Sequence, residues 1–299
     1  MIVNADCIEH LKTIEDNYFD SVVTDPPYHL TSIAKRFTNS TEAKYGKDGS
    51  FQRLSKGFVG HEWDGGDIAF TTDLWKEVYR TIKPGAVLLA FAATRNYHRM
   101  ATAIENSGFE IFDMINWIYG SGFPKRKNLL KPAHEPIVMA RKGVNKDLNL
   151  DECRIPLDEN DDKNNWVGNR KKKTMMDKNI YKLGIKEITS KQNDKGRWPA
   201  NVIHDGLEED WSKYFYCTKA SKKEKGDTEH PTVKPIDLMR YLVKLITPKD
   251  GLVLDPFAGT GTTGEACILE GRNYYLIEKT KKYITDIEKR INKYDRLGI

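Results

Sequence analysis

Apolar runs of strand length alternate with helical periodicity near both ends of this chain, and this pattern limits the fold more than any other feature. Strand-like runs occupy residues 2–4, 21–24, 86–91, 110–119, 135–140, 251–254 and 273–277. Helical periodicity occupies residues 7–14, 72–82, 96–106, 235–246, 262–270 and a final helix. Such alternation predicts an α/β fold, a doubly wound and mostly parallel sheet, in which residues 110–119 and 135–140 can pair as an antiparallel hairpin.

Two polar regions interrupt this alternation. Residues 29–66 are polar and glycine-rich, which indicates a long mobile loop. Residues 142–229 contain few apolar clusters, which indicates an inserted and partly irregular module. We therefore divide the chain into residues 1–141, the insertion 142–229 and residues 230–299, with the first and last parts sharing one sheet.

Length and composition exclude several classes of protein. The 299 residues can bury a sizeable core without external support. The four cysteines lie far apart, without a C-x-x-C pair or histidines at metal-ligand spacing, so we expect a reducing compartment and no metal site. The first residues do not resemble a signal peptide, and no stretch approaches the roughly 20 apolar residues of a membrane span. A cytoplasmic protein is the expectation.

A glycine-rich segment at residues 255–263 follows a buried strand and opens a helix. Its glycines allow the backbone to approach a ligand at the carboxyl edge of the sheet. Glu278 ends the next strand, about where a ribose-binding acid belongs. The spacing fits a dinucleotide site, a nucleoside site or a purely structural turn. It excludes a Walker A loop, because no Lys-Ser/Thr pair follows the glycines.

The tetrapeptide Asp25-Pro26-Pro27-Tyr28 ends another buried strand. Prolines cannot continue the hydrogen-bond ladder of a strand, but they hold the chain in a rigid extended turn. A given tetrapeptide occurs by chance in about one of several hundred chains of this length. A simple strand-stopping turn is therefore a poor explanation, and the presence of the glycine segment weakens it further.

Together the two motifs resemble those of amino-type DNA methyltransferases, and their order resembles the permuted beta class of that family. Residues 122–125, 131–136 and 196–201 are similar to segments of its phage and mobile-element members. This resemblance covers nearly the whole chain. It implies a seven-stranded Rossmann-like sheet, S-adenosylmethionine as the methyl donor and double-stranded DNA as the partner. Residues 1–141 would then be the catalytic half, 142–229 the target-recognition region and 230–299 the cofactor-binding half.

The resemblance also implies a set of cofactor contacts. The glycine segment would shape the pocket for the methionine end, Glu278 would bond the ribose hydroxyls, and Lys279 would flank the adenine. Asp6 would accept from the adenine amine, although its context fits a helix N-cap equally well. The implied residues are Asp6, Cys7, Thr232, Lys234, Asp255, Phe257, Ala258, Gly259, Thr260, Gly261, Thr262, Thr263, Glu278 and Lys279.

The chemistry of a base amine explains the residue types of the tetrapeptide. An exocyclic amine is a poor nucleophile because its lone pair is delocalised into the ring. The Asp25 carboxylate and the Pro26 carbonyl can each accept one amine hydrogen and so favour a pyramidal nitrogen, while Pro27 stiffens the turn. The base must leave the duplex to be reached, and Tyr28 offers an aromatic face for stacking. No cysteine nucleophile is needed.

Other residues are candidates for DNA contact. From Lys163 to Arg197 the chain has 11 Lys or Arg residues against three acidic residues, a net charge of +8. Lys171, Lys172, Lys173 and Arg197 would contact phosphates, although such a run also fits a solvated surface loop. Trp117 could form a second wall around the flipped base or belong to the core.

Four hypotheses compete, and the sequence leaves open whether the protein is a monomer or a homodimer. The leading one is N6-adenine methylation of duplex DNA, because Asp at the first motif position is more frequent among adenine enzymes of this type. The nearest alternative is N4-cytosine methylation. A catalytically silent DNA-binding protein conflicts with the intact Asp25 and Tyr28, and a nicotinamide dehydrogenase leaves the tetrapeptide unexplained.

Overall fold

The structure is a computed structural model, and it describes the chain in segments. Backbone and side chains are described for residues 1–28, 67–119, 130, 132–143, 147–156, 196–204, 220–221, 224, 228 and 233–294, and the backbone alone for 44–45, 51–52 and 295. The chain divides into two compact units. One comprises Met1–Asn149 with Ala200–Ile299, and the other comprises Leu150–Pro199.

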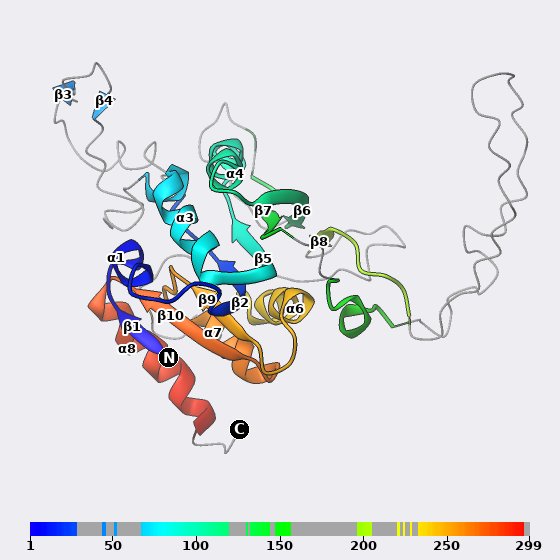
Figure 1. The fold of residues 1–299 in the computed structure, drawn as a ribbon. Coiled ribbons are helices and arrows are strands. Elements are labelled where there is room, and N and C mark those ends of the chain that lie inside the picture. Colours follow the sequence, from blue (N-terminus) through cyan, green and yellow to red (C-terminus); the bar gives the residue numbers. More distant parts are fainter. Residues whose placement is uncertain are drawn as a thin grey trace, which may run out of the picture. The chain divides into compact units, whose positions relative to one another are not determined.

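An eight-stranded sheet forms the centre of the larger unit (Figure 1). Its strands, in spatial order, are β1 (Ile2–Asn4), β10 (Asn273–Glu278), β9 (Leu252–Asp255), β2 (Phe19–Thr24), β5 (Ile82–Phe91), β7 (His134–Arg141), β6 (Glu110–Ile118) and β8 (Val202–His204). Only β7 runs antiparallel to its neighbours in this sheet. The α/β class, the mostly parallel sheet and the antiparallel pairing of β6 with β7 are confirmed.

The prediction of seven strands was wrong by one. Strand β8 pairs in parallel with β6, where Val202 lies opposite Asn116 and His204 opposite Ile118. This strand lies within residues 142–229, which the sequence assigned to the insertion. Its three residues are too few for alternation to distinguish a strand from an irregular apolar cluster. Two further short strands, β3 (Lys44–Tyr45) and β4 (Phe51–Gln52), pair with each other within the predicted loop 29–66.

Helices cover the sheet in two groups (Figure 1). Helix α3 (Thr72–Thr81) contacts both α1 (Cys7–Leu11) and α4 (Tyr97–Glu105), and helix α7 (Thr262–Leu269) contacts both α6 (Ile236–Ile246) and α8 (Lys281–Asp295). Strand β10 shows that the groups lie on opposite faces, because side chains alternate along a strand. Tyr275 and Ile277 belong to the core cluster under α1 and α3, whereas Leu276 packs with Ile287 of α8.

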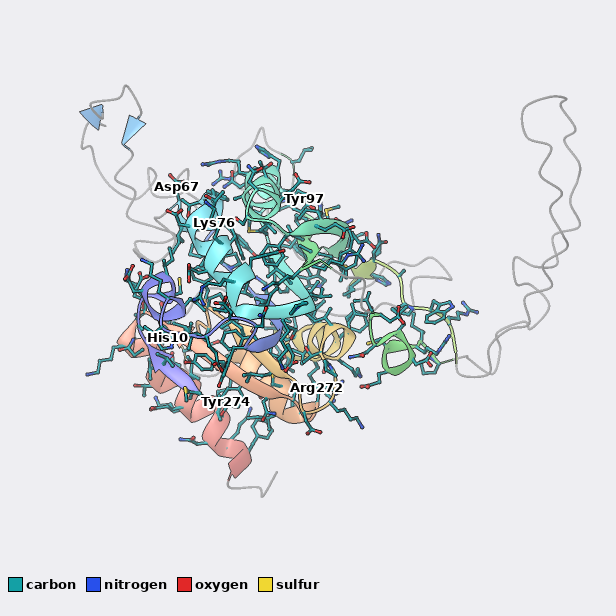
Figure 2. The ribbon with its side chains drawn as sticks, in the orientation of Figure 1. His10, Asp67, Lys76, Tyr97, Arg272 and Tyr274 are labelled. Atoms are coloured by element: carbon teal, nitrogen blue, oxygen red, sulfur yellow. The ribbon has the colours of Figure 1, made fainter. Side chains whose placement is uncertain are left out.

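Helix α3 shows how the core fixes the helices. Its apolar residues Leu74, Trp75 and Val78 are fully buried, whereas the adjacent Lys76 is exposed (Figure 2). The indole N–H of Trp75 donates to the Ala69 carbonyl at 3.0 Å, so its one polar group is satisfied. Each such large apolar side chain stabilises the fold by roughly 2–3 kcal/mol through burial.

Strand β5 begins earlier than the sequence predicts. The expected helix 72–82 and strand 86–91 leave Lys83-Pro84-Gly85 as a turn between them, but these residues lie within β5. The pairing with β2 shifts register here, since Phe19 pairs with Ile82 and Ser21 with Val87. Gly85 has a φ of 79° and its N–H donates to the Lys142 carbonyl at 2.7 Å. The Pro-Gly signal therefore marks a bulge inside a strand.

The smaller unit is held by local contacts. A 3-10 helix, η4 (Leu150–Cys153), precedes a bridge in which Ile155 and Arg197 exchange two backbone hydrogen bonds. The guanidinium of Arg154 lies 3.8 Å from the ring centroid of the exposed Trp198 and donates to the Gly196 carbonyl at 3.0 Å. Among the helices of the described segments, none has the length and apolar character needed to cross a membrane.

Candidate active site

The sheet order brings the two sequence motifs to one edge. Strands β2 and β9 are parallel neighbours, with Val22 opposite Leu254, so the tetrapeptide and the glycine segment both leave the sheet at its carboxyl edge. The Thr24 hydroxyl, which directly precedes the tetrapeptide, donates to Asp255 Oδ1 at 2.8 Å. This position, at the carboxyl ends of adjacent strands, is where open α/β sheets bind ligands.

Asp255 organises the glycine segment from within the core. Its side chain is buried, and it accepts hydrogen bonds from the Thr24 hydroxyl, the Phe257 N–H at 3.1 Å and the Thr263 hydroxyl at 2.6 Å. Burial raises the pKa of Asp255 to about 6, against the three hydrogen bonds that favour its charged form. The residue therefore shapes the turn through internal contacts.

Asp255→Asn should reduce the pH dependence of folding stability. A folded pKa near 6 and an unfolded value of 3.8 mean that the unfolded chain ionises first as pH rises. This group thus makes folding more favourable below pH 3.8, and about 3 kcal/mol of that stability is lost as pH rises through 6. Urea unfolding of both proteins between pH 4 and pH 7 would measure this, and parallel curves would contradict it.

Glu278 locks the glycine turn at the end of β10. Its Oε2 accepts from the Gly259 N–H at 2.9 Å, and its Oε1 accepts from the Thr280 N–H at 2.7 Å. Burial raises the pKa of Glu278 despite these bonds. Each carboxylate oxygen can accept a second hydrogen bond, so the donor chemistry fits a ligand with vicinal hydroxyls such as a ribose.

The turn itself depends on glycine at position 261. Gly261 has a φ of 78°, and a Cβ added there would lie 2.9 Å from Ile287 Cγ2. We expect Gly261→Ala to lower the free energy of unfolding by roughly 1–3 kcal/mol and to weaken cofactor binding. Gly271 is a matched control, because its φ is 65° but nothing lies within 4 Å of an added Cβ. If both variants lose the same free energy of unfolding in urea, close packing against Ile287 is not the cause.

Asp6 and Cys7 begin helix α1 beside the glycine turn. Asp6 caps the helix by accepting from the Ile8 N–H at 3.1 Å, and its other oxygen accepts from Lys279 Nζ at 3.1 Å. The N-cap reading of Asp6 is therefore confirmed, and the cofactor contact stays a prediction. Burial, followed by the negative charge of Asp6, raises the pKa of Cys7 to about 12, so its thiol is neutral at physiological pH.

The tetrapeptide presents a buried oxygen atom. Asp25 Oδ2 accepts from Lys234 Nζ at 2.6 Å, whereas Asp25 Oδ1 is buried without a hydrogen-bond partner in the described segments. Pro26 is buried beside it. The Tyr28 carbonyl accepts from Asn96 Nδ2 at 2.7 Å, which fastens the far end of the turn to the start of α4. A buried carboxylate oxygen without a donor is costly, so its presence indicates a ligand that donates hydrogen.

Three side chains outside the tetrapeptide complete this site. Lys234 Nζ also lies 3.1 Å from the Tyr28 hydroxyl and 3.2 Å from Glu135 Oε2, and the Tyr28 hydroxyl donates to that same oxygen at 3.2 Å. The sequence singled out Glu135 only as part of a similar segment and did not predict Asn96. Strand β7 is antiparallel to β5, so its first residues meet the carboxyl edge of β2 and β5. The predicted hairpin with β6 did not indicate that β7 would lie beside β5.

The structure describes only some of the residues predicted to contact DNA. Trp117 is 2% exposed, lies opposite Glu135 in the β6–β7 pairing, and packs edge-on against Tyr119 at 5.3 Å between ring centroids. Arg197 lies in the bridge of the smaller unit. Four predicted site residues fall outside the described residues: Thr232, Lys171, Lys172 and Lys173. Within the described segments, no cluster of His, Cys, Asp or Glu side chains could hold a metal ion.

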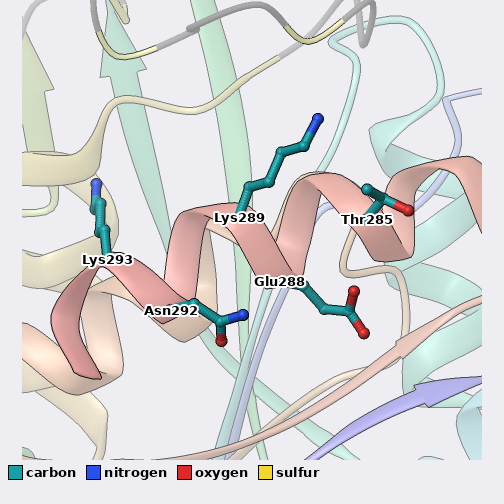
Figure 3. Close-up of a pocket in the computed structure, with 5 residues that line it drawn as sticks. All are labelled: Thr285, Glu288, Lys289, Asn292 and Lys293. Atoms are coloured by element: carbon teal, nitrogen blue, oxygen red, sulfur yellow. The ribbon is translucent and has the colours of Figure 1, made fainter. Parts of the chain in front are cut away.

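A surface hollow of about 260 Å³ lies along helix α8 (Figure 3). Its lining side chains project from the exposed face of that one helix: Thr285, Glu288, Lys289, Asn292 and Lys293. None of them belongs to the two motifs. The hollow is therefore separate from the candidate active site.

Comparison with known proteins supports the two motifs. A family model described as DNA methylase matches residues 19–289. The type II methyltransferase M.HinfI of Haemophilus influenzae is 27% identical over 294 residues, which covers 97% of this chain and 67% of the relative. M.HpaI of Haemophilus parainfluenzae is 26% identical over 294 residues, covering 97% of this chain and 74% of the relative. These matches span both motifs and the region between them.

Solved structures share the fold at lower identity. The M1.HpyAVI–SAM complex has a TM-score of 0.56 and 19% identity, with 98% of each chain covered. The PvuII DNA methyltransferase, which is cytosine-N4-specific, has a TM-score of 0.60 and 17% identity, with 97% of this chain and 85% of that chain covered. The fold described above is therefore shared with these methyltransferases.

Proposed function

This chain belongs to the DNA methylase family, and from that premise we propose that it methylates the N6 amine of an adenine flipped out of duplex DNA. It is a site-specific DNA methyltransferase that uses S-adenosylmethionine. We further propose that it belongs to the permuted beta class, because Asp25 precedes the glycine segment in the chain. Residues 122–125, 131–136 and 196–201 resemble segments of phage and mobile-element members, and on that resemblance we propose the same type here. The reaction takes place where both motifs leave the sheet.

The single observation that carries the proposal is the buried Oδ1 of Asp25. This oxygen can accept one hydrogen of the target amine, and the Pro26 carbonyl can accept the other. Both acceptors are held by a rigid proline turn, so little reorganisation is required when the amine becomes pyramidal. The neutral thiols of Cys7 and Cys267, both buried, take no part in this transfer.

The cofactor supplies a methyl group on a sulfonium, which is electrophilic without further activation. The residues that would hold it lie along the carboxyl ends of β1, β9 and β10. Glu278 would accept from the ribose hydroxyls, Asp6 from the adenine amine, and Lys279 would flank the adenine. The glycine turn and Phe257 would enclose the methionine end, together with Thr232.

DNA binding would combine stacking with phosphate contacts. Burial and the negative charges of Asp25 and Glu135 raise the pKa of Tyr28 well above its usual range, so its phenol stays neutral. A neutral aromatic ring can stack on an extruded base regardless of sequence. Trp117 is the second candidate wall. The basic residues Lys171, Lys172, Lys173 and Arg197 would contact phosphates.

N4-cytosine methylation is the second candidate. The same pair of acceptors would orient a cytosine amine, and the fold is shared with a cytosine-N4-specific enzyme. Asp at the first motif position favours adenine by resemblance. Labelled S-adenosylmethionine and unmethylated DNA, followed by mass spectrometry of the nucleosides, would decide between them. N6-methyladenine is the expected product, N4-methylcytosine would replace our proposal, and no labelled base would refute both.

A further inference from the structure

Lys234 is enclosed by the catalytic motif. Its side chain is 8% exposed, and its Nζ lies 2.6 Å from Asp25 Oδ2, 3.1 Å from the Tyr28 hydroxyl and 3.2 Å from Glu135 Oε2. Its charge also lies 4.6 Å from the ring centroid of Phe91, within cation–π range. The three polar contacts account for all three hydrogens of an ammonium group.

The charges around Lys234 keep it protonated. Burial alone would lower the pKa of the Lys234 ammonium, but Asp25 and Glu135 together outweigh burial and raise it. The cluster thus holds two carboxylates and one permanent positive charge. Such a buried cation is stable only while its partners stay in place, so it also fixes their positions.

The ion pair also breaks the symmetry of the Asp25 carboxylate. A free carboxylate can rotate and exchange its two oxygens, and either could then meet the amine. Because Lys234 engages Oδ2 at 2.6 Å, the other oxygen is the one left to accept. We propose that Lys234 and Glu135 are positioning residues, which hold Asp25 in one orientation with Oδ1 toward the target amine. This inference rests on the proposed methyl transfer.

Glu135 acts one step further from the reaction. Its Oε2 forms an ion pair with Lys234 and accepts a hydrogen bond from the Tyr28 hydroxyl. Glu135 therefore holds the ammonium on one side and the stacking ring on the other. Glu135 itself is held by strand β7, opposite Trp117 of β6. Removing its charge would leave Lys234 free to shift toward Asp25 and would release Tyr28. The two residues therefore act on the amine through Asp25 and on the base through Tyr28.

The test compares kcat and KM in the full chain. Lys234→Met removes the charge while retaining most of the apolar stem. We expect kcat for DNA methylation to fall on the order of 100-fold, because a small displacement of an aligned acceptor costs that much. The KM and the calorimetric Kd for S-adenosylmethionine should change less than twofold. Glu135→Gln should lower kcat about tenfold in the same way, and Lys234→Arg should recover part of the loss.

A control separates this effect from the general loss of a lysine–carboxylate ion pair, although Lys83 is more exposed than Lys234. Lys83 of β5 pairs with Asp20 of β2 at 2.7 Å. This ion pair lies outside the site, so Lys83→Met should leave kcat unchanged. If Lys234→Met instead weakens cofactor binding at unchanged kcat, Lys234 contacts the cofactor and the inference is overturned. Unchanged kcat and KM in both Lys234→Met and Glu135→Gln would also overturn it. An inactive wild-type protein would refute the proposed function itself, before any variant is compared.

Discussion

Asp25→Ala is expected to abolish methyl transfer to DNA while cofactor binding stays largely intact. The variant removes the buried Oδ1 that we assign to the target amine, and loss of such a transition-state acceptor commonly costs about 100-fold or more in kcat. The described hydrogen bonds of Asp25 run to Lys234, away from the glycine turn, so the turn should persist. Single-turnover methylation and calorimetric titration with S-adenosylmethionine measure the two quantities separately.

Asp25→Asn provides a sharper version of this experiment. The amide oxygen would accept from Lys234, and the amide NH2 would then face the target amine, so a donor would meet a donor. We therefore expect Asn to be as inactive as Ala but better folded. Asp73→Asn, an exposed acid in the first turn of α3, should keep full activity. Wild-type turnover by either Asp25 variant would refute the catalytic assignment.

Glu265→Ala is expected to destabilise the larger unit strongly. Glu265 is 4% exposed, and it accepts from Arg290 at 2.5 Å, from Lys293 and from the Tyr294 hydroxyl at 2.7 Å. Its removal would leave Arg290 without its carboxylate in a partly buried position. Breaking a buried pair in this way costs about 3 kcal/mol or more of the free energy of unfolding. Urea unfolding followed by circular dichroism would measure it.

The same variant should also affect the glycine segment. Arg290 Nε donates to the Thr260 carbonyl at 2.9 Å, so a displaced Arg290 would loosen the turn and raise the KM for S-adenosylmethionine. Glu288→Ala is the control, since Glu288 is exposed on α8, the helix that carries Arg290, and its loss should change stability by less than about 0.5 kcal/mol. If Glu265→Ala lowers the free energy of unfolding no more than the control does, this ion network does not contribute to stability.

Periodicity alone predicted most of the architecture. The strand after Gly251 and the helix after Gly261 were expected almost where they occur, because a short apolar run marks the strand and the glycine turn marks the start of the helix. The glycine segment was expected at the carboxyl edge of the sheet, and the neighbouring strands β2 and β9 place it there together with the tetrapeptide. Strand β8 was missed because three residues carry too little pattern.

The contacts between motifs could not be predicted in this way. Lys234 was assigned to the cofactor by resemblance, yet its described contacts are with Asp25, Tyr28 and Glu135. Glu135 reaches the site only because β7 reverses direction within the sheet. Strand direction and order are set by the packing of the whole chain, so a pairing across more than 200 residues leaves no trace in local sequence.

Strand β2 has one neighbour, β5, from the same part of the chain and the other, β9, from more than 200 residues later. During synthesis the first half of the sheet must therefore leave the ribosome with one edge of β2 unpaired, and that edge is flanked by buried apolar side chains. Long-range pairing of this kind is slow to form. We expect a nascent chain ending before β9 to need chaperone protection, and methylation of DNA to be impossible until β9 has been added.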